Sequence, residues 1–137
     1  MFRKWLKNTG MHTLFVYGGL MRGEEFHDPY LTGAQFFGEA LISGFGLYNL
    51  GPYSGIRHTD EPYVVHGELY GINEKEFNEI CILEANGKLF QCEEVIATLK
   101  DSGMQIKAET FVYLGKVFDE ERLSGLVQSW KNRKKVY

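Results

Sequence analysis

Short β-rich segments that end at glycine constrain the fold of this chain more than any other sequence feature. Glycine makes up 16 of the 137 residues, and the pairs Gly18-Gly19 and Gly51-Pro52 stop apolar runs with predicted turns. Six segments have the composition of strands, namely residues 13–17, 38–43, 45–50, 64–72, 95–99 and 106–114. The last two are joined through Asp101-Ser102-Gly103, a predicted hairpin turn. Gly67 and Gly71 predict a close approach or a bulge within the longest strand, so we expect a sheet-rich core.

Helical signals are fewer than strand signals. Asn73 and Glu76 have the spacing of a capping box, which predicts a helix that begins there, and Asn86-Gly87 is expected to end it. Residues 21–37 are expected to form a long loop with one short helix. A second helix is predicted over residues 120–131, where apolar side chains recur at amphipathic spacing: Leu123, Leu126, Val127 and Trp130. The whole is therefore predicted to be a small α+β domain in which several strands curl around one or two helices.

The length and composition favour one soluble domain. A chain of 137 residues with 44% hydrophobic and 24% charged residues is typical of a single globular core. No segment approaches the ~20 apolar residues of a membrane span, and residues 1–10 lack the apolar stretch of a secretory signal. Cys81 and Cys92 are too few for a disulfide framework, so we expect reduced thiols and a cytoplasmic protein. We divide the chain into a basic extension (1–12), a main domain (13–115) and a C-terminal helix with a basic tail (116–137).

The charges are distributed unevenly along the chain. The net charge is −3, but seven of the 15 basic residues lie in segments 1–12 and 131–137, which contain no acids. The rest of the chain holds eight basic residues against 18 acidic ones, a net charge of −10. An acidic body argues against nucleic-acid binding. The basic ends (Arg3, Lys4, Lys7 and Lys131 to Lys135) are either solvated or recruit the domain to an anionic lipid or RNA.

Glu84 is the first candidate for chemistry. On a helical period, Phe77, Ile80 and Cys81 form one apolar stripe, and Glu84 is its next member. Burial and the negative end of the helix dipole would both raise the pKa of this carboxyl, which suits general acid–base work near neutral pH. The alternative is that the helix ends before Glu84, or that the carboxylate pairs with an arginine.

The second candidate is the turn Tyr17-Gly18-Gly19-Leu20 after the first predicted strand. Successive glycines let backbone N–H groups converge on an anion, and a glycine at position 19 would permit positive φ. The alternative is a plain turn, because the glycine spacing of nucleotide-binding loops is missing. The histidines show no metal-binding spacing, no serine lies in a nucleophile elbow, and Cys81 fits core packing. We therefore expect neither a metal nor a cofactor.

An ordered series of motifs resembles the gamma-glutamylcyclotransferase-like proteins, also called the AIG2-like family. The resemblance covers about residues 14–114. Its motifs are LFVYGGLMRG at 14–23, FFGEA at 36–40, LYNLGPY at 47–53, VHGELY at 65–70 and Leu83-Glu84. The resemblance implies a small mixed β-barrel flanked by helices, with a cavity at one end. It also implies an enzyme that expels an amine from a small γ-glutamyl compound and releases 5-oxoproline without a cofactor.

The resemblance assigns roles to the same two candidates. The backbone from Gly18 to Leu20, after Tyr17, would hold the glutamyl group, and Glu84 would act as base and then as acid. The chain departs from the family pattern around this site. Gly19 replaces a serine or threonine, and further replacements lie beside Glu84: Cys81 for an acid, Ala85 for a glycine, Asn86 for an aromatic residue, and Phe90, Gln91 and Cys92 for a tyrosine and arginines. These changes suggest either an unusual leaving amine or a non-catalytic module that binds a metabolite or a partner.

Overall fold

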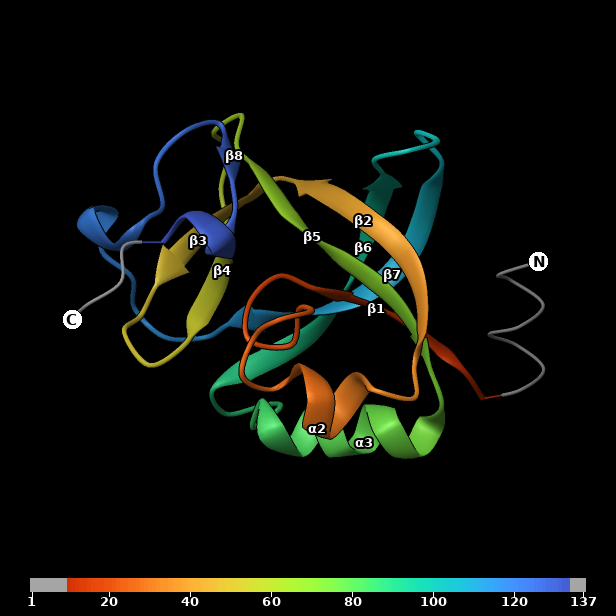
Figure 1. The fold of residues 1–137 in the computed structure, drawn as a ribbon. Helices are drawn as coiled ribbons and strands as arrows, with labels where there is room; N and C mark the ends of the chain where they lie inside the picture. Colours follow the sequence, from red (N-terminus) through yellow and green to blue (C-terminus); the bar gives the residue numbers. More distant parts are fainter. Residues whose placement is uncertain (1–9, 134–137) are drawn as a thin grey trace.

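A closed five-stranded barrel forms the centre of the molecule (Figure 1). The computed structural model describes residues 10–133. Around the barrel the strands follow the order β1 (His12–Val16), β7 (Gln105–Tyr113), β6 (Phe90–Leu99), β2 (Gln35–Ser43) and β5 (Val64–Ile72). Antiparallel pairing of β5 with β1 then closes the barrel, while β1 and β7 run parallel. The predicted α+β class and the mixed β-barrel are therefore confirmed.

Strand β5 lies at the heart of this arrangement, because it pairs with β2 along one edge and with β1 along the other. Every residue after Val64 in β5 is buried. A side chain at Gly67 would place its Cβ atom 2.3 Å from the Val16 carbonyl oxygen. Glycine therefore allows the backbones of β5 and β1 to approach closely, as the sequence predicted.

Two helices lie side by side beneath the barrel (Figure 1). The short helix α2 (His27–Leu31) interrupts the loop after β1, and α3 (Glu74–Leu83) follows β5 directly. The predicted capping box is present, because the Asn73 side chain accepts a hydrogen bond from the Glu76 N–H and the Glu76 side chain accepts one from the Asn73 N–H, both at 2.8 Å. Ile80 is the residue that α3 buries completely in the core.

The end of α3 differs from the prediction. The helix stops at Leu83 with Glu84 as its C-cap, three residues before the expected Asn86-Gly87 end. Ala85 adopts a positive φ of 47°, which takes the chain out of the helix. The Asn86 side chain then accepts a hydrogen bond from the Cys92 N–H at 2.9 Å, which ties this loop to β6. Glu84 therefore lies at the helix end rather than within its last turn.

A separate hairpin of β3 (Phe45–Asn49) and β4 (Ser54–His58) packs beside the barrel. The sequence predicts β3 and the turn at Gly51-Pro52, but it gives no sign of β4. Ile56 is the single aliphatic residue of β4, so the strand has no apolar pattern of its own. Its pairing with β3 supplies the backbone partners that the pattern could not predict.

The predicted helix over residues 120–131 is wrong. This region contains a 3-10 turn (Asp119–Glu121), the two-residue strand β8 (Val127–Gln128) and a second 3-10 turn (Trp130–Asn132). Gly125 has a φ of 89°, which interrupts any helix. Buried Gln128 accepts a hydrogen bond from the Leu47 N–H at 2.8 Å, while β8 pairs in parallel with β5. The segment is therefore held by tertiary contacts of single residues, and the predicted amphipathic helix does not form.

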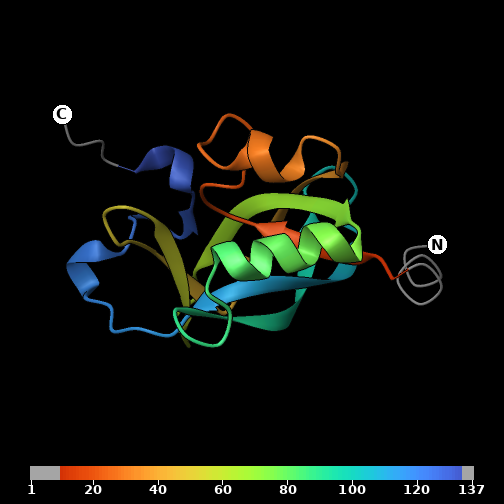
Figure 2. The same ribbon diagram turned by 90° about the horizontal axis from the view of Figure 1, so that it is seen from below.

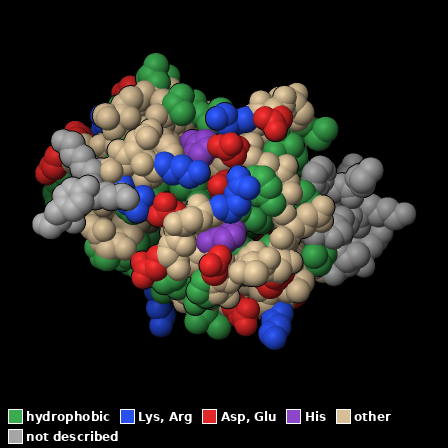
Figure 3. Space-filling view, viewed as in Figure 1, with side chains coloured by type: hydrophobic (Ala, Val, Ile, Leu, Met, Phe, Trp, Pro, Cys, Tyr) green, Lys and Arg blue, Asp and Glu red, His purple; other side chains and the backbone are tan. Residues whose placement is uncertain are grey.

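Acidic and basic side chains are interspersed on the face of the molecule seen in Figure 3, where they lie beside histidines. Among the described residues, no helix is long and apolar enough to cross a membrane. The basic residues Arg3, Lys4 and Lys7 of the predicted N-terminal extension lie outside the described residues, as do Lys134 and Lys135 at the other end.

Candidate active site

A cavity of about 580 Å³ opens at the end of β1. Its walls come from the turn after β1, the β3–β4 hairpin, the end of α3, the start of β6 and the C-terminal 3-10 turn. Figure 2 shows the C-terminal turn, in blue, beside the orange-red loop that precedes α2. A cavity of this size suits a small molecule, and aromatic and apolar side chains make up most of its lining.

The structure brings together all five residues predicted from the sequence. Tyr17, Gly18, Gly19, Leu20 and Glu84 line this one cavity, although the turn and the end of α3 lie far apart in the sequence. The barrel closure explains their meeting. Strand β5 ends beside the start of β1, and α3 follows β5 and stops at Leu83 with Glu84 as its C-cap. The turn after β1 and the end of α3 therefore reach the same side of the barrel.

Glu84 is partly buried at the end of α3, and it lines the cavity. Its backbone N–H donates to the Ile80 carbonyl at 2.9 Å, which holds the residue at the end of α3. Burial raises the pKa of Glu84 from 4.5 to about 7. A carboxyl with this pKa is present in both protonation states near neutral pH, so it can accept and return a proton.

Tyr17 has a structural role at the edge of the same site. Its hydroxyl donates a 2.6 Å hydrogen bond to the Phe111 carbonyl on β7. Burial raises the pKa of Tyr17 well above 10, and the nearby charge of Glu84 raises it further. The phenol therefore stays protonated, and its proton is committed to the barrel wall rather than to the cavity.

The turn after β1 is shaped by hydrogen bonds and close packing. The Gly18 carbonyl accepts from the Met21 N–H at 3.0 Å, and the Gly19 carbonyl accepts from the Phe26 N–H at 2.8 Å. Within residues 10–133, the backbone N–H groups of Gly19 and Leu20 have no hydrogen-bond acceptor. Both residues line the cavity, so these two N–H groups are candidate donors to a ligand oxygen.

The reason for the glycine pair differs from the prediction. Neither Gly18 nor Gly19 has positive φ, so that part of the expectation is wrong. Space is the constraint instead. A Cβ atom at Gly18 would lie 1.9 Å from the Ser54 Oγ atom, and one at Gly19 would lie 2.9 Å from the Phe26 ring. The pair lets the hairpin and the α2 loop pack against the turn.

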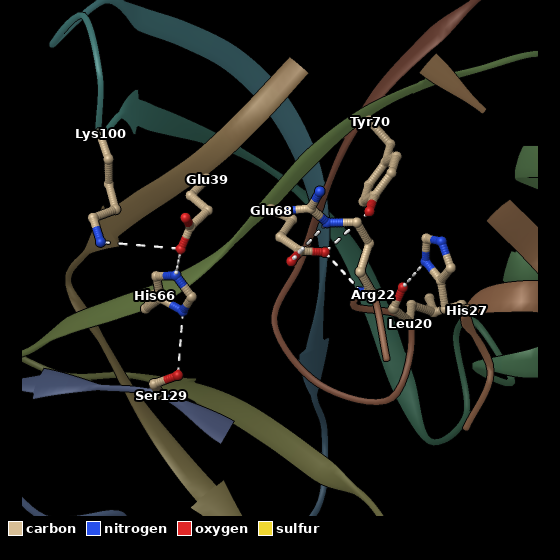
Figure 4. Close-up of polar contacts among 9 residues, drawn as sticks. All are labelled: Leu20, Arg22, His27, Glu39, His66, Glu68, Tyr70, Lys100 and Ser129. Carbon is tan, nitrogen blue, oxygen red and sulfur yellow. Dashed lines mark hydrogen bonds and ion pairs between the residues drawn. The ribbon is translucent and has the colours of Figure 1, made fainter. Parts of the chain in front are cut away.

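A buried carboxylate supports the turn from behind (Figure 4). Glu68 on β5 is completely buried and accepts hydrogen bonds from the Arg22 N–H at 2.9 Å and from the Tyr70 hydroxyl at 3.0 Å. The Arg22 Nε atom lies 3.6 Å from the other Glu68 oxygen. His27 adds a hydrogen bond from its Nδ1 atom to the Leu20 carbonyl at 3.0 Å. The turn is thus fixed by side chains that do not line the cavity.

Sequence reasoning did not identify these supporting residues or several residues of the cavity wall. Strand alternation over residues 64–72 places Glu68 and Tyr70 on the same side of β5, which is the one signal that pairs them. Ser54 of the unpredicted β4 lines the cavity, and so does Arg133, which the charge pattern grouped with a basic tail. Only the fold brings Arg133 to the cavity.

Two further polar clusters lie outside this cavity. His66 lies 2.7 Å from Glu39 through Nε2 and 3.2 Å from the Ser129 hydroxyl through Nδ1 (Figure 4). His12 lies between Glu109 and Glu74 at 2.6 and 2.5 Å. Across the described part of the chain, no group of three His, Cys, Asp or Glu residues has an arrangement that could hold a metal ion.

Comparison with known proteins identifies the family. The family model for gamma-glutamyl cyclotransferase, AIG2-like proteins matches residues 14–132. The chain belongs to this family. The match confirms the resemblance seen in the sequence, and it extends past residue 114 to include the C-terminal turn.

Individual relatives agree with this assignment. A protein of Methanocaldococcus jannaschii, provisionally named a gamma-glutamylcyclotransferase, is 31% identical over 105 residues, which span 75% of this chain and 85% of that protein. The gamma-glutamylcyclotransferase family protein YtfP of Escherichia coli K12 is 35% identical over 74 residues, or 54% of this chain and 63% of that protein.

Solved structures show the same fold. An AIG2-like protein from mouse superimposes with a TM-score of 0.72 at 20% identity, over 81% of this chain and 82% of that one. A protein of Pyrococcus horikoshii superimposes with a TM-score of 0.65 at 28% identity, over 82% of this chain and 85% of that one. The barrel with two helices is therefore the family fold.

Proposed function

We propose that this protein cyclises a small γ-glutamyl amine, amide or peptide, and releases 5-oxoproline and the free amine. The observation that carries the proposal is the placement of Glu84. A carboxyl with a pKa of about 7 lies in the same cavity as two backbone N–H donors without acceptors. Family membership supports the same class of reaction.

The reaction needs little equipment, because the nucleophile is part of the substrate. Glu84 first takes a proton from the substrate α-ammonium group, and the free amine then attacks the γ-carbonyl carbon. The new C–N bond closes a five-membered ring, in which tethering supplies the proximity that a bimolecular reaction lacks. The N–H groups of Gly19 and Leu20 would donate to the oxygen on which negative charge develops.

Collapse of the tetrahedral intermediate completes the exchange of one amide for another. The bond from the γ-carbonyl carbon to the departing nitrogen breaks, and the carbonyl re-forms within the ring. Two protons leave the α-nitrogen during the cycle, and two reach the departing nitrogen, which leaves as an ammonium ion. Glu84 would carry these protons in turn, so neither a metal nor a cofactor enters the scheme.

A panel of γ-glutamyl compounds tests this proposal directly. The protein is incubated with γ-glutamyl amines, amides and dipeptides, and 5-oxoproline is detected by mass spectrometry. Release from any member, absent without protein, supports the enzyme and reports the leaving amine. Binding of these compounds without product would support a non-catalytic module instead, which the altered positions Gly19, Cys81, Ala85 and Asn86 leave open.

We further propose a cytoplasmic location and a small γ-glutamyl molecule, rather than a nucleic acid, as the ligand. Cys81 and Cys92 are free thiols in the structure, as is usual for proteins of reducing compartments. The acidic body favours neither RNA nor DNA as a ligand.

A further inference from the structure

Arg133 is held firmly at the cavity wall by the C-terminal turn. Its Nη2 atom donates to a Glu24 carboxylate oxygen at 3.0 Å, and its Nη1 atom donates to the Trp130 carbonyl at 2.9 Å. The guanidinium also stacks over the Trp130 ring, 4.6 Å from its centroid. Trp130 is buried, and the Arg133 side chain is 22% exposed. The orientation of the guanidinium is therefore fixed before any ligand binds.

Among the described residues that line the cavity, Arg133 is the one lysine or arginine. The other charged groups there are the carboxylates of Glu24, Glu25 and Glu84. A guanidinium carries five N–H donors, and the contacts with Glu24 and Trp130 use two of them. Donors therefore remain that can form a charge-assisted pair with a ligand anion.

We propose that Arg133 binds the α-carboxylate of the glutamyl group, and this inference rests on the function proposed above. The glutamyl group has three polar functions: an ammonium, a carboxylate and a γ-carbonyl. The cavity has three matching features, namely the Glu84 carboxylate, the Arg133 guanidinium and the N–H pair of Gly19 and Leu20. The carboxylate has one partner of suitable charge, because Arg133 is the one cation among the described residues of the lining. Arg133 thus makes a carboxylate next to the reacting amine a requirement for tight binding.

A pair of lactams tests the assignment without any need for turnover. 5-Oxoproline and 2-pyrrolidinone share the ring and differ in the carboxylate. Calorimetry should show that the parent protein binds 5-oxoproline about tenfold to a hundredfold more tightly, the usual strength of a hydrogen bond to a charged group. Arg133→Gln should remove this preference, and Arg133→Lys should keep part of it. Lys131→Gln is the control, because Lys131 is exposed on the same turn and does not line the cavity.

A matched pair of substrates extends the test to catalysis. A γ-glutamyl amide and the 4-aminobutyryl amide of the same amine both cyclise through the same ring, but the second lacks the carboxylate. Arg133→Gln should lower kcat/KM about tenfold to a hundredfold for the first and less than about twofold for the second. Equal losses for both would overturn the assignment, since they would show a structural role.

The two arms also separate this inference from the proposed function. If the parent discriminates between the lactams through Arg133 but releases no 5-oxoproline from any compound, the proposed function fails and the assignment of Arg133 stands. If the parent turns over γ-glutamyl compounds and Arg133→Gln changes neither lactam binding nor kcat/KM, the proposed function stands and the assignment of Arg133 fails. A parent that binds neither lactam also overturns the assignment.

Discussion

Replacement of Glu84 by glutamine separates the charge of this side chain from its shape. As a general base and acid, Glu84 moves protons that an amide cannot move. Glu84→Gln should therefore lower kcat at least about a hundredfold, the lower range of general acid–base contributions. In the parent, kcat/KM should rise about tenfold per pH unit below pH 7 and level off above it, because the base must be ionised and its pKa is about 7.

The same substitution should increase stability in a pH-dependent way. Since burial raises the pKa of Glu84 from 4.5 to about 7, the folded state keeps a proton that the unfolded chain loses between these values. The free energy of unfolding of the parent therefore falls as the pH rises through this window, by up to about 3 kcal/mol. Glutamine has no charge to bury. The variant should match the parent near about pH 4 and exceed it by up to about 3 kcal/mol near about pH 8.

Urea unfolding at both pH values, together with the 5-oxoproline assay, checks both expectations. Glu79→Gln is the matched control, because Glu79 lies on α3 but is exposed to solvent; it should change neither activity nor the pH dependence of stability. A Glu84→Gln protein with near-full turnover would refute the role of Glu84 as base. Loss of activity with marked destabilisation would indicate a paired structural carboxylate instead.

Three further substitutions probe the support of the site. Gly19→Val should raise the Michaelis constant roughly tenfold while the fold survives, because the new Cβ atom would lie 2.9 Å from the Phe26 ring and displace the turn; unchanged kinetics in a folded variant would remove this turn from the site. Glu68→Ala leaves the Arg22 N–H without its acceptor, so a melt should show a loss of about 3 kcal/mol or more, with lower kcat/KM; a stable, fully active variant would contradict the support described for the turn. Asn73→Ala removes the capping box, and should cost about 1 kcal/mol in denaturant unfolding without changing kcat; altered kcat would show that the start of α3 is coupled to catalysis.

Local patterns in the sequence were sufficient for features that a few neighbouring residues decide. The capping box of Asn73 and Glu76 predicted the start of α3, because both hydrogen bonds span one helical turn. The alternation over residues 64–72 predicted β5, and Gly67 predicted its close approach to another strand. The helical period also placed Glu84 toward the core side, although the helix ended one residue earlier than that period required.

Long-range contacts decided the rest, and no local pattern could reveal them. Strand β4 forms because it pairs with β3. The C-terminal segment makes contacts of single residues, such as that of Gln128 with Leu47, in place of the predicted helix. The helical stripe failed there because a positive φ at Gly125 and the burial of one polar side chain outweighed apolar spacing. The barrel closure, in which β1 pairs with the distant strand β5, also brings the turn after Tyr17 to Glu84. Arg133 is held at the cavity by a contact of the same kind, because its partner Glu24 lies 109 residues away in the sequence and becomes a neighbour only when the chain has folded.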